Sequence, residues 1–559
     1  MEEPGLVPRL SIRDFPEPEA PLPPDDGVEE LLHRRTHRRL VERRDVVEDP
    51  RMLPSTLAAL LAAFPAFAAL PQAPADAKPV KEVQKPPEEP RGLRLRDPGA
   101  TPGYTLLAPL NSKAIHLVDL DGEVVHTWNT KHAPGGVTRF LPNGNLLRSA
   151  QLPDPKRFHG GGIAGRIEEL DWDGNVVWEY ELATEERILH HDFTVLPNGN
   201  LLCIAWEYHA PDAVRAMGRN PAFVHEKGLW ADVLIEVERK EKKIVWEWRS
   251  IDHLVQDTDP KLPRYGKPAD FPGRIDFNAD NRFLPAKESE EDRRKREERE
   301  KEMRRVGYVG GDDDEEEDEG KDKPKPSPRP REEVSADWLH SNSVQHLPEH
   351  DLIVISTPHY SELWVIDHST TTAEAASESG GRWKRGGALL YRYGNPRNYG
   401  RGDATTRKLF YQHDPTWITK PGSSELRLLV FNNGGRRPGK EHSSVEELVL
   451  PFDPKQGFLG GKDAAFGPAE PAWVYKDEER FFSAFISGAQ RLANGNTLVC
   501  EGAKGRVFEV TPDGKVVWDF WSPLGGEIEP AKHGGKAPPN ALFRAERLAP
   551  DHPGLRGKL

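Results

Sequence analysis

One strand pattern returns six times along the chain, each time short, apolar and rich in aromatic residues. The copies are GEVVHTW (122–128), GNVVWEY (174–180), KIVWEW (243–248), ALLYRYG (388–394), AWVYKD (472–477) and GKVVWDF (514–520). A repeated unit that cannot bury its own apolar face must stack on its neighbours. The sequence therefore predicts a repeat architecture.

A complete unit is clearest between Ser487 and Phe520, where four short strands follow one another. Asn494-Gly495 and Asp513-Gly514 supply the positive φ angles that tight hairpins need. Antiparallel four-stranded units in series predict an all-β fold, a β-propeller. The other units begin near Gly135, His190, His340 and His413, with an incomplete unit at Gly103.

The incomplete first unit lacks its innermost strand, and the segment ALFRAERLAP (541–550) has the pattern of such a strand. Since unpaired sheet edges are costly, we expect this segment to pair beside residues 103–110. The prediction is a six-bladed β-propeller over residues 102–559, closed by the C-terminal strand joining the first blade. A β-sandwich is the alternative, but it would leave the last strand unexplained.

Composition limits the function classes. The formal net charge of −14 and the absence of a basic stripe argue against a nucleic-acid partner. Cys203 and Cys500 each lie inside an apolar strand of a different unit. We interpret them as small buried hydrophobic residues, with a disulfide or a metal site as the alternative.

The N-terminal region has no strand pattern. Residues 1–51 are rich in proline and charge, and residues 52–77 form an apolar segment with small residues near its end. This suits a signal peptide better than a transmembrane helix, which needs about 20 apolar residues. We expect a protein that leaves the cytoplasm, with translation starting at Met52 or with residues 1–51 as a long basic leader. An alanine-rich linker is the alternative.

Two further segments carry no chemistry in this interpretation. Residues 78–101 are expected to be a proline-rich linker. A charged insertion at about 284–334 has nothing to bury and is expected to stay solvated. A metal-collecting acidic loop at 312–319 is the alternative there.

Histidines mark the starts of the innermost strands. When the units are aligned on their turns, three of the five visible starts carry histidine: His190-His191, His340 and His413. Because the inner strands of a propeller all start at one mouth of the channel, these side chains should share a rim. The alternatives are a structural role at strand ends and a metal held by three imidazoles. Asp192 and Asp414 directly follow histidines and could orient them.

Four segments resemble the arylsulfotransferase family, the PAPS-independent aryl-sulfate sulfotransferases. They are HHDFTVLPNGNLL (190–202), DWLHSNSV (337–344), QHDPTWI (412–418) and ISGAQRLANGNTLVCEGAKGRVFEV (486–510). The resemblance implies a periplasmic six-bladed propeller that moves a sulfuryl group from an aryl sulfate to a phenol through a sulfohistidine, without a cofactor. The family carries an arginine where this chain has Pro358, with His359 beside it.

The resemblance also implies roles. His413 would be the nucleophile, His340 and His191 would shuttle the proton or bind the sulfuryl oxygens, and His190 is the alternate for His191. A neutral imidazole can attack sulfur, and a second imidazole can act as general acid and base. The expected substrate-binding residues are Arg506, Arg166, Asn342 and His359; no metal site is assigned. A propeller that binds a ligand or a protein without catalysis is the alternative function.

Overall fold

Antiparallel sheets make up most of the chain that the structure describes. The computed structural model describes residues 90–153, 157–279, 294, 334–526 and 539–559. The expected leader (1–51), the signal peptide (52–77) and nearly all of the charged insertion (284–334) lie outside these residues. The domain predictions for those segments therefore stay predictions.

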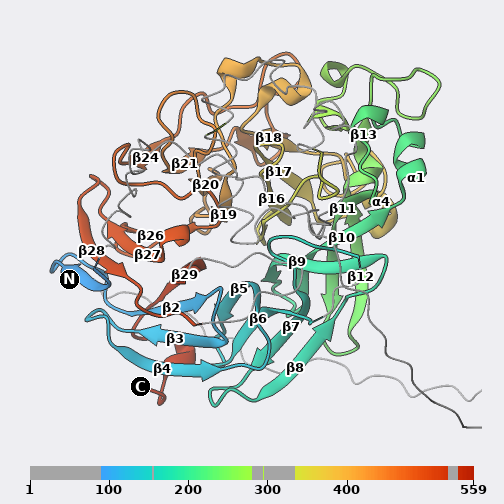
Figure 1. The fold of residues 1–559 in the computed structure, drawn as a ribbon. Coiled ribbons are helices and arrows are strands. Elements are labelled where there is room, and N and C mark those ends of the chain that lie inside the picture. Colours follow the sequence, from blue (N-terminus) through green and yellow to red (C-terminus); the bar gives the residue numbers. More distant parts are fainter. Residues whose placement is uncertain (1–89, 154–156, 280–293, 295–333, 527–538) are drawn as a thin grey trace, which may run out of the picture. The chain divides into compact units, whose positions relative to one another are not determined.

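Four separate sheets have four or five strands each and form a propeller-like arrangement (Figure 1). Their strands are, sheet by sheet, β29 (Leu542–Leu548), β2 (Tyr104–Pro109), β3 (Ala114–Val118) and β4 (Val124–Asn129); β15 (Ser343–Leu347), β16 (Leu352–Thr357), β17 (Glu362–Asp367) and β18 (Tyr391–Tyr393); β19 (His413–Trp417), β20 (Arg427–Asn432), β21 (Ser444–Val449) and β24 (Trp473–Lys476); and β25 (Gly488–Arg491), β26 (Thr497–Glu501), β27 (Arg506–Val510), β28 (Val516–Trp521) and β1 (Gly92–Arg96).

The two remaining predicted units are halves of one eight-stranded sheet. Its strands are β5 (Pro134–Phe140), β6 (Leu146–Gln151), β7 (Gly165–Leu170), β8 (Val176–Glu181), β9 (Arg187–Val195), β10 (Leu201–His209), β11 (Leu229–Glu238) and β12 (Lys243–Arg249). One parallel bridge between Gly136 and His191 joins the halves. A Cβ on Gly136 would lie 2.2 Å from the carbonyl oxygen of His191, so only glycine permits this approach. The structure thus has four separate blades where the sequence predicted six.

The C-terminal strand lies where the sequence placed it. β29 pairs antiparallel with β2, with Tyr104 opposite Leu548 and Leu107 opposite Ala545 (Figure 1). The chain end therefore supplies the strand that the first unit lacks.

Part of the expected linker 78–101 is a strand instead. β1 pairs with the outer strand β28, and Leu93 packs against a buried cluster that contains Trp518 and Phe520. Pairing with β28 and partial burial of the Leu93 side chain hold this segment, which we expected to be a linker, in a strand.

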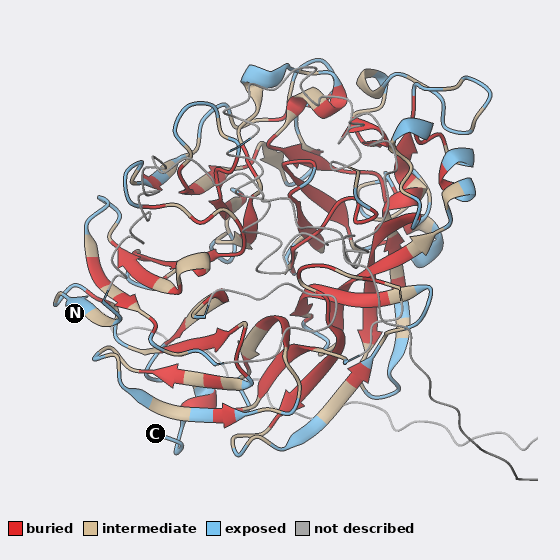
Figure 2. Cartoon of the chain, viewed as in Figure 1, coloured by how far each residue is buried: buried red, intermediate tan, exposed pale blue. Residues whose placement is uncertain are grey.

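The recurring aromatic strands pack between neighbouring sheets, as the repeat interpretation requires. One cluster joins Tyr475 of β24 to Val499 and Phe508 of the following sheet. The innermost strands are buried along most of their length (Figure 2). Cys203 and Cys500 are buried and form no disulfide in the described structure, and burial raises the pKa of both thiols. The prediction that both cysteines are small buried residues is confirmed.

Other regular structure is short. It comprises the helices α1 (Pro211–Ala216) and α4 (Thr372–Ala375), several 3-10 turns, and the strand pairs β13 (Leu254–Val255) with β14 (Ile275–Asp276) and β22 (Phe452–Asp453) with β23 (Gly457–Phe458). Among the described residues, no helix has the length and apolar character needed to span a membrane.

Candidate active site

The structure brings the predicted histidines together on three inner strands, in the middle of β9 and at the starts of β15 and β19. His190 and His191 lie on β9, His340 precedes β15, and His413 opens β19; we call these four the rim histidines. Each is at most 3% exposed. The ring centroid of His191 lies 4.5 Å from that of His340 and 5.0 Å from that of His190. Burial, followed by the nearby charges of His340, His190 and His413, lowers the pKa of His191 well below its usual value.

Backbone strain accompanies this cluster. His191 and His340 both have a φ of 53°, in the left-handed region that non-glycine residues rarely adopt. Such conformations cost about 1–3 kcal/mol each and concentrate at functional sites. The rings of these two residues meet edge to face. Positive φ angles recur at the starts of β19 and β25, at Asp414 (53°) and Ser487 (94°), so they also belong to the repeated unit.

His413 is held in one tautomer. Its Nδ1 lies 2.7 Å from Oδ1 of Asn433, while Nδ2 of Asn433 donates to the carbonyl oxygens of Ser483 (2.8 Å) and Ile486 (2.9 Å). Because these acceptors fix the orientation of the amide, its oxygen must face His413 and Nδ1 must carry the proton. The lone pair therefore sits on Nε2. Burial lowers the pKa of His413 to about 3, so the ring is neutral.

His340 has the opposite charge preference. Its Nδ1 is hydrogen-bonded to the buried carboxylate of Asp337. Burial lowers the pKa of His340, but the charge and hydrogen bond of Asp337 outweigh it, and the net shift is upward. Two imidazoles whose environments push their pKa values apart have the properties that an acid and a nucleophile require.

His190 supports His191. Nε2 of His190 lies 2.9 Å from Oδ1 of Asp232, and its Nδ1 lies 2.7 Å from Nδ1 of His191. The ring stacks on Trp206 with centroids 4.1 Å apart. This arrangement favours His191 over His190 as the histidine that faces a substrate.

The two predicted arginines are engaged within their own sheets. Arg166 pairs with Glu168, Glu179 and Glu181, and Arg506 pairs with Asp519 and Glu501. These carboxylates lie on the same strand as the arginine or on a neighbouring strand of the same sheet. An alignment of the repeated units does not reveal such ion pairs. We therefore replace both residues as candidates for the arginine beside the histidines.

Arg544 of β29 is the arginine that lies beside the rim histidines. Its Nη1 lies 2.9 Å from Oδ2 of Asp192, and its Nε lies 3.0 Å from Oδ1 of Asp414. The side chain is 11% exposed, and Nη2 donates to Oγ of Ser343 at 2.6 Å. Asp192 and Asp414 thus bind Arg544 rather than orienting the histidines before them. The sequence signal was a charged residue, Arg544, directly after the apolar start of an inner strand.

The other two predicted substrate-binding residues, Asn342 and His359, differ in their exposure to solvent. Asn342 is buried, and its Nδ2 donates to the carbonyl oxygen of Gln412 at 3.1 Å, which ties the start of β15 to the residue before His413. His359 is exposed in the turn after β16, and its ring stacks on His340 with centroids 5.0 Å apart. His359 therefore joins the buried cluster to solvent.

A cavity of about 170 Å³ adjoins the arginine side of the site. Arg139, Asp414, Arg544 and Glu546 supply its charged lining. As far as the chain is described, the rim histidines do not line this cavity. It offers charged groups next to the histidine cluster.

Comparison with known proteins identifies the class to which this fold and site belong. The model of the Arylsulfotransferase (ASST) family matches residues 104–517, which is most of the chain. The chain belongs to the arylsulfotransferase family. The resemblance seen in the sequence is confirmed, and membership supports an arylsulfotransferase-like function with small-molecule substrates.

No curated protein matches the chain. Solved structures that resemble it include a protein of unknown function from Bacteroides caccae (11% identity, 80% of this chain and 99% of that chain, TM-score 0.37). The periplasmic gluconolactonase PpgL of Pseudomonas aeruginosa is 11% identical over 76% of this chain and 97% of its own, with a TM-score of 0.31. Similarities this low say nothing about the function of this chain.

Proposed function

We propose that this protein transfers a sulfuryl group from an aryl sulfate to a phenolic acceptor through a sulfated His413. The observation that carries the proposal is the difference between two buried imidazoles. His413 is neutral with its lone pair on Nε2, whereas the charge and hydrogen bond of Asp337 raise the pKa of His340. A nucleophile and an acid of this kind suit a double displacement.

The first half-reaction transfers the group to the enzyme. Nε2 of His413 attacks sulfur, the bond between sulfur and the phenolic oxygen breaks, and His340 gives its proton to the leaving oxygen. In the second half-reaction His340 takes the proton of the acceptor phenol, whose oxygen attacks sulfur as the N–S bond breaks. His191 and His359 flank His340 and would bind the sulfuryl oxygens or exchange protons with solvent.

We further propose that the ring has six blades. The eight-stranded sheet would act as two blades, because only the bridge of Gly136 with His191 pairs β5 with β9, and the pairing of β29 with β2 would close the ring. This architecture would bring the starts of β9, β15 and β19 to one mouth of the channel.

Export is part of the proposal. The apolar segment 52–77 with its small-residue end supports a cleaved signal peptide and a periplasmic location. N-terminal sequencing of the protein from its native host should begin between about Ala69 and Lys78. Recovery of an intact Met1 from the cytoplasm would contradict export.

A propeller that binds a ligand without turnover is the second candidate. Proline stands where the family carries arginine, and the rim histidines are buried. Incubation of the purified protein with 4-nitrophenyl sulfate, with and without a phenol, separates the two. Release of 4-nitrophenol that accelerates with the acceptor supports the transferase. Binding without release supports the second candidate.

A further inference from the structure

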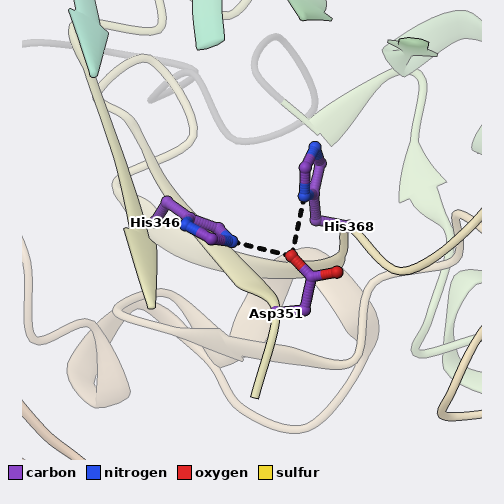
Figure 3. Close-up of side chains that lie close together, drawn as sticks. All are labelled: His346, Asp351 and His368. Carbon is purple, nitrogen blue, oxygen red and sulfur yellow. Dashed lines mark hydrogen bonds and ion pairs between the residues drawn. The ribbon is translucent and has the colours of Figure 1, made fainter. Parts of the chain in front are cut away.

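A second histidine cluster lies apart from the rim histidines. His346 is on β15, Asp351 is in the turn between β15 and β16, and His368 directly follows β17. Figure 3 shows both imidazoles directed at one carboxylate oxygen. Nε2 of His346 lies 2.7 Å, and Nδ1 of His368 lies 2.8 Å, from Oδ1 of Asp351. The three possible ligand atoms lie within 4.8 Å of one another.

The cluster is partly enclosed. The side chains of His346 and His368 are 6% and 11% exposed, while that of Asp351 is 38% exposed. Two nitrogen donors therefore lie largely out of solvent, and the carboxylate keeps one open side. An ion could enter from this side and keep a water ligand there.

A second carboxylate, that of Glu236, fixes the orientation of the His368 ring through the nitrogen that faces away from Asp351. Its Nε2 lies 3.2 Å from Oε2 of Glu236 on β11, and Oε1 of Glu236 accepts from Nδ2 of Asn198 (3.0 Å) and Asn200 (2.6 Å). A carboxylate that holds the outer nitrogen of an imidazole is the usual support of a histidine that ligates a metal.

We propose that His346, Asp351 and His368 bind one divalent transition-metal ion of the zinc type. Zinc takes imidazole nitrogen at about 2.0–2.1 Å and carboxylate oxygen at about 2.0–2.2 Å in a tetrahedron, which separates neighbouring ligand atoms by roughly 3.3 Å. The two N–O distances of 2.7 and 2.8 Å need to open by about half an ångström. Nitrogen-rich sites with one carboxylate favour zinc or cobalt over magnesium or calcium.

The site would connect two sheets. Its ligands belong to the sheet of β15–β18, whereas Glu236 belongs to β11 of the eight-stranded sheet. A bound ion would hold the turn of Asp351 against β17, and His368 would carry this restraint to Glu236. The role is structural and independent of the proposed sulfuryl transfer.

Metal titration of the full chain tests the proposal. The protein is treated with EDTA, dialysed, and titrated with Zn²⁺ by calorimetry and with Co²⁺ by visible absorption. We expect one ion per chain and the intense absorption of tetrahedral Co²⁺. The double variant His346→Ala/His368→Ala should lose this ion, and Glu236→Gln should bind it about tenfold more weakly.

Two variants control for folding. Asp351→Asn tolerates the φ of 53° at this position, so the turn should persist while the anionic ligand is lost and affinity falls at least tenfold. His350→Ala, beside the site, should bind as the wild type does. Stoichiometric uptake that persists in the double variant, or wild-type protein that takes up no Co²⁺, would overturn the proposal in favour of a hydrogen-bonded cluster only.

Discussion

The side-chain oxygen of Asn433 lies 2.7 Å from Nδ1 of His413 and fixes which nitrogen of that imidazole carries the proton. The two hydrogen bonds that Asn433 donates to backbone carbonyls hold the amide in this orientation. The unprotonated Nε2 is the atom that the proposed reaction needs as nucleophile. This relationship links the buried backbone of the site to its chemistry.

Asn433→Ala should lower kcat for sulfuryl transfer about 10- to 100-fold, because Nδ1 of His413 loses this closer acceptor and keeps the more distant carbonyl oxygen of Tyr411, at 3.1 Å. The neighbouring Asn432 is the matched control, since it is equally buried and bonds Phe410 and Lys408 instead. Asn432→Ala should lose stability without the same loss of rate per folded molecule. Equal rate losses in the two variants would show that Asn433 acts only through folding.

Asp337→Asn should slow turnover in a way that depends on the leaving group. Loss of the Asp337 charge lowers the pKa of His340 and weakens it as the acid that protonates the leaving phenolate. General acids contribute about 10²- to 10⁴-fold. Turnover of phenyl sulfate, whose phenolate is a poor leaving group, should fall by close to this factor. Turnover of 4-nitrophenyl sulfate, which releases a more stable phenolate, should fall much less. A uniform loss across substrates would rule out His340 as the general acid.

Stability should fall as the pH drops from 6.5 to 5. Burial lowers the pKa of His413 to about 3 and that of His253 to about 4. The unfolded chain titrates near 6.5 and binds more protons than the folded chain below this pH, so each group removes up to about 1.4 kcal/mol per pH unit. Urea unfolding at several pH values should show a smaller slope for His253→Gln than for the wild type. Identical slopes for the two proteins would show that the pKa of His253 is not lowered in the folded chain.

Arg544→Met should destabilise the fold by about 3–5 kcal/mol, because it leaves Asp192 and Asp414 buried without their cation. The triple variant that also carries Asp192→Asn and Asp414→Asn should regain part of this loss. Arg506→Met, which opens an ion pair farther out in its sheet, serves as comparison. Urea unfolding measures all three, and a loss below about 1 kcal/mol for Arg544→Met would mean that the pairings are weak.

Local patterns made much of the fold predictable. The aromatic strands and the Asn-Gly and Asp-Gly turns indicated the units, and Gly495 and Gly514 have the positive φ values expected there, 92° and 85°. The spare strand at residues 541–550 pairs with β2 as expected. Two features could not be predicted: the joining of two units into one sheet at Gly136 and the pairing of β1 with β28. Both depend on contacts between distant segments.

The histidines were predictable because repeat position places them, but their partners were not. Arg544 meets Asp192 and Asp414 across three strands that lie far apart in the sequence. The carboxylates that engage Arg166 and Arg506 come from neighbouring strands, which the alignment of units did not consider. Asn433 gave no signal, since it lies after β20 in a segment without a motif.

Trapping of the intermediate tests the central claim. The protein is mixed with an aryl sulfate in the absence of an acceptor, digested at alkaline pH and analysed by mass spectrometry. We predict one added sulfuryl group, labile to acid, on the peptide that contains His413, and none on His413→Gln. A sulfuryl group on another residue, or wild-type turnover by His413→Gln, would contradict the sulfohistidine mechanism.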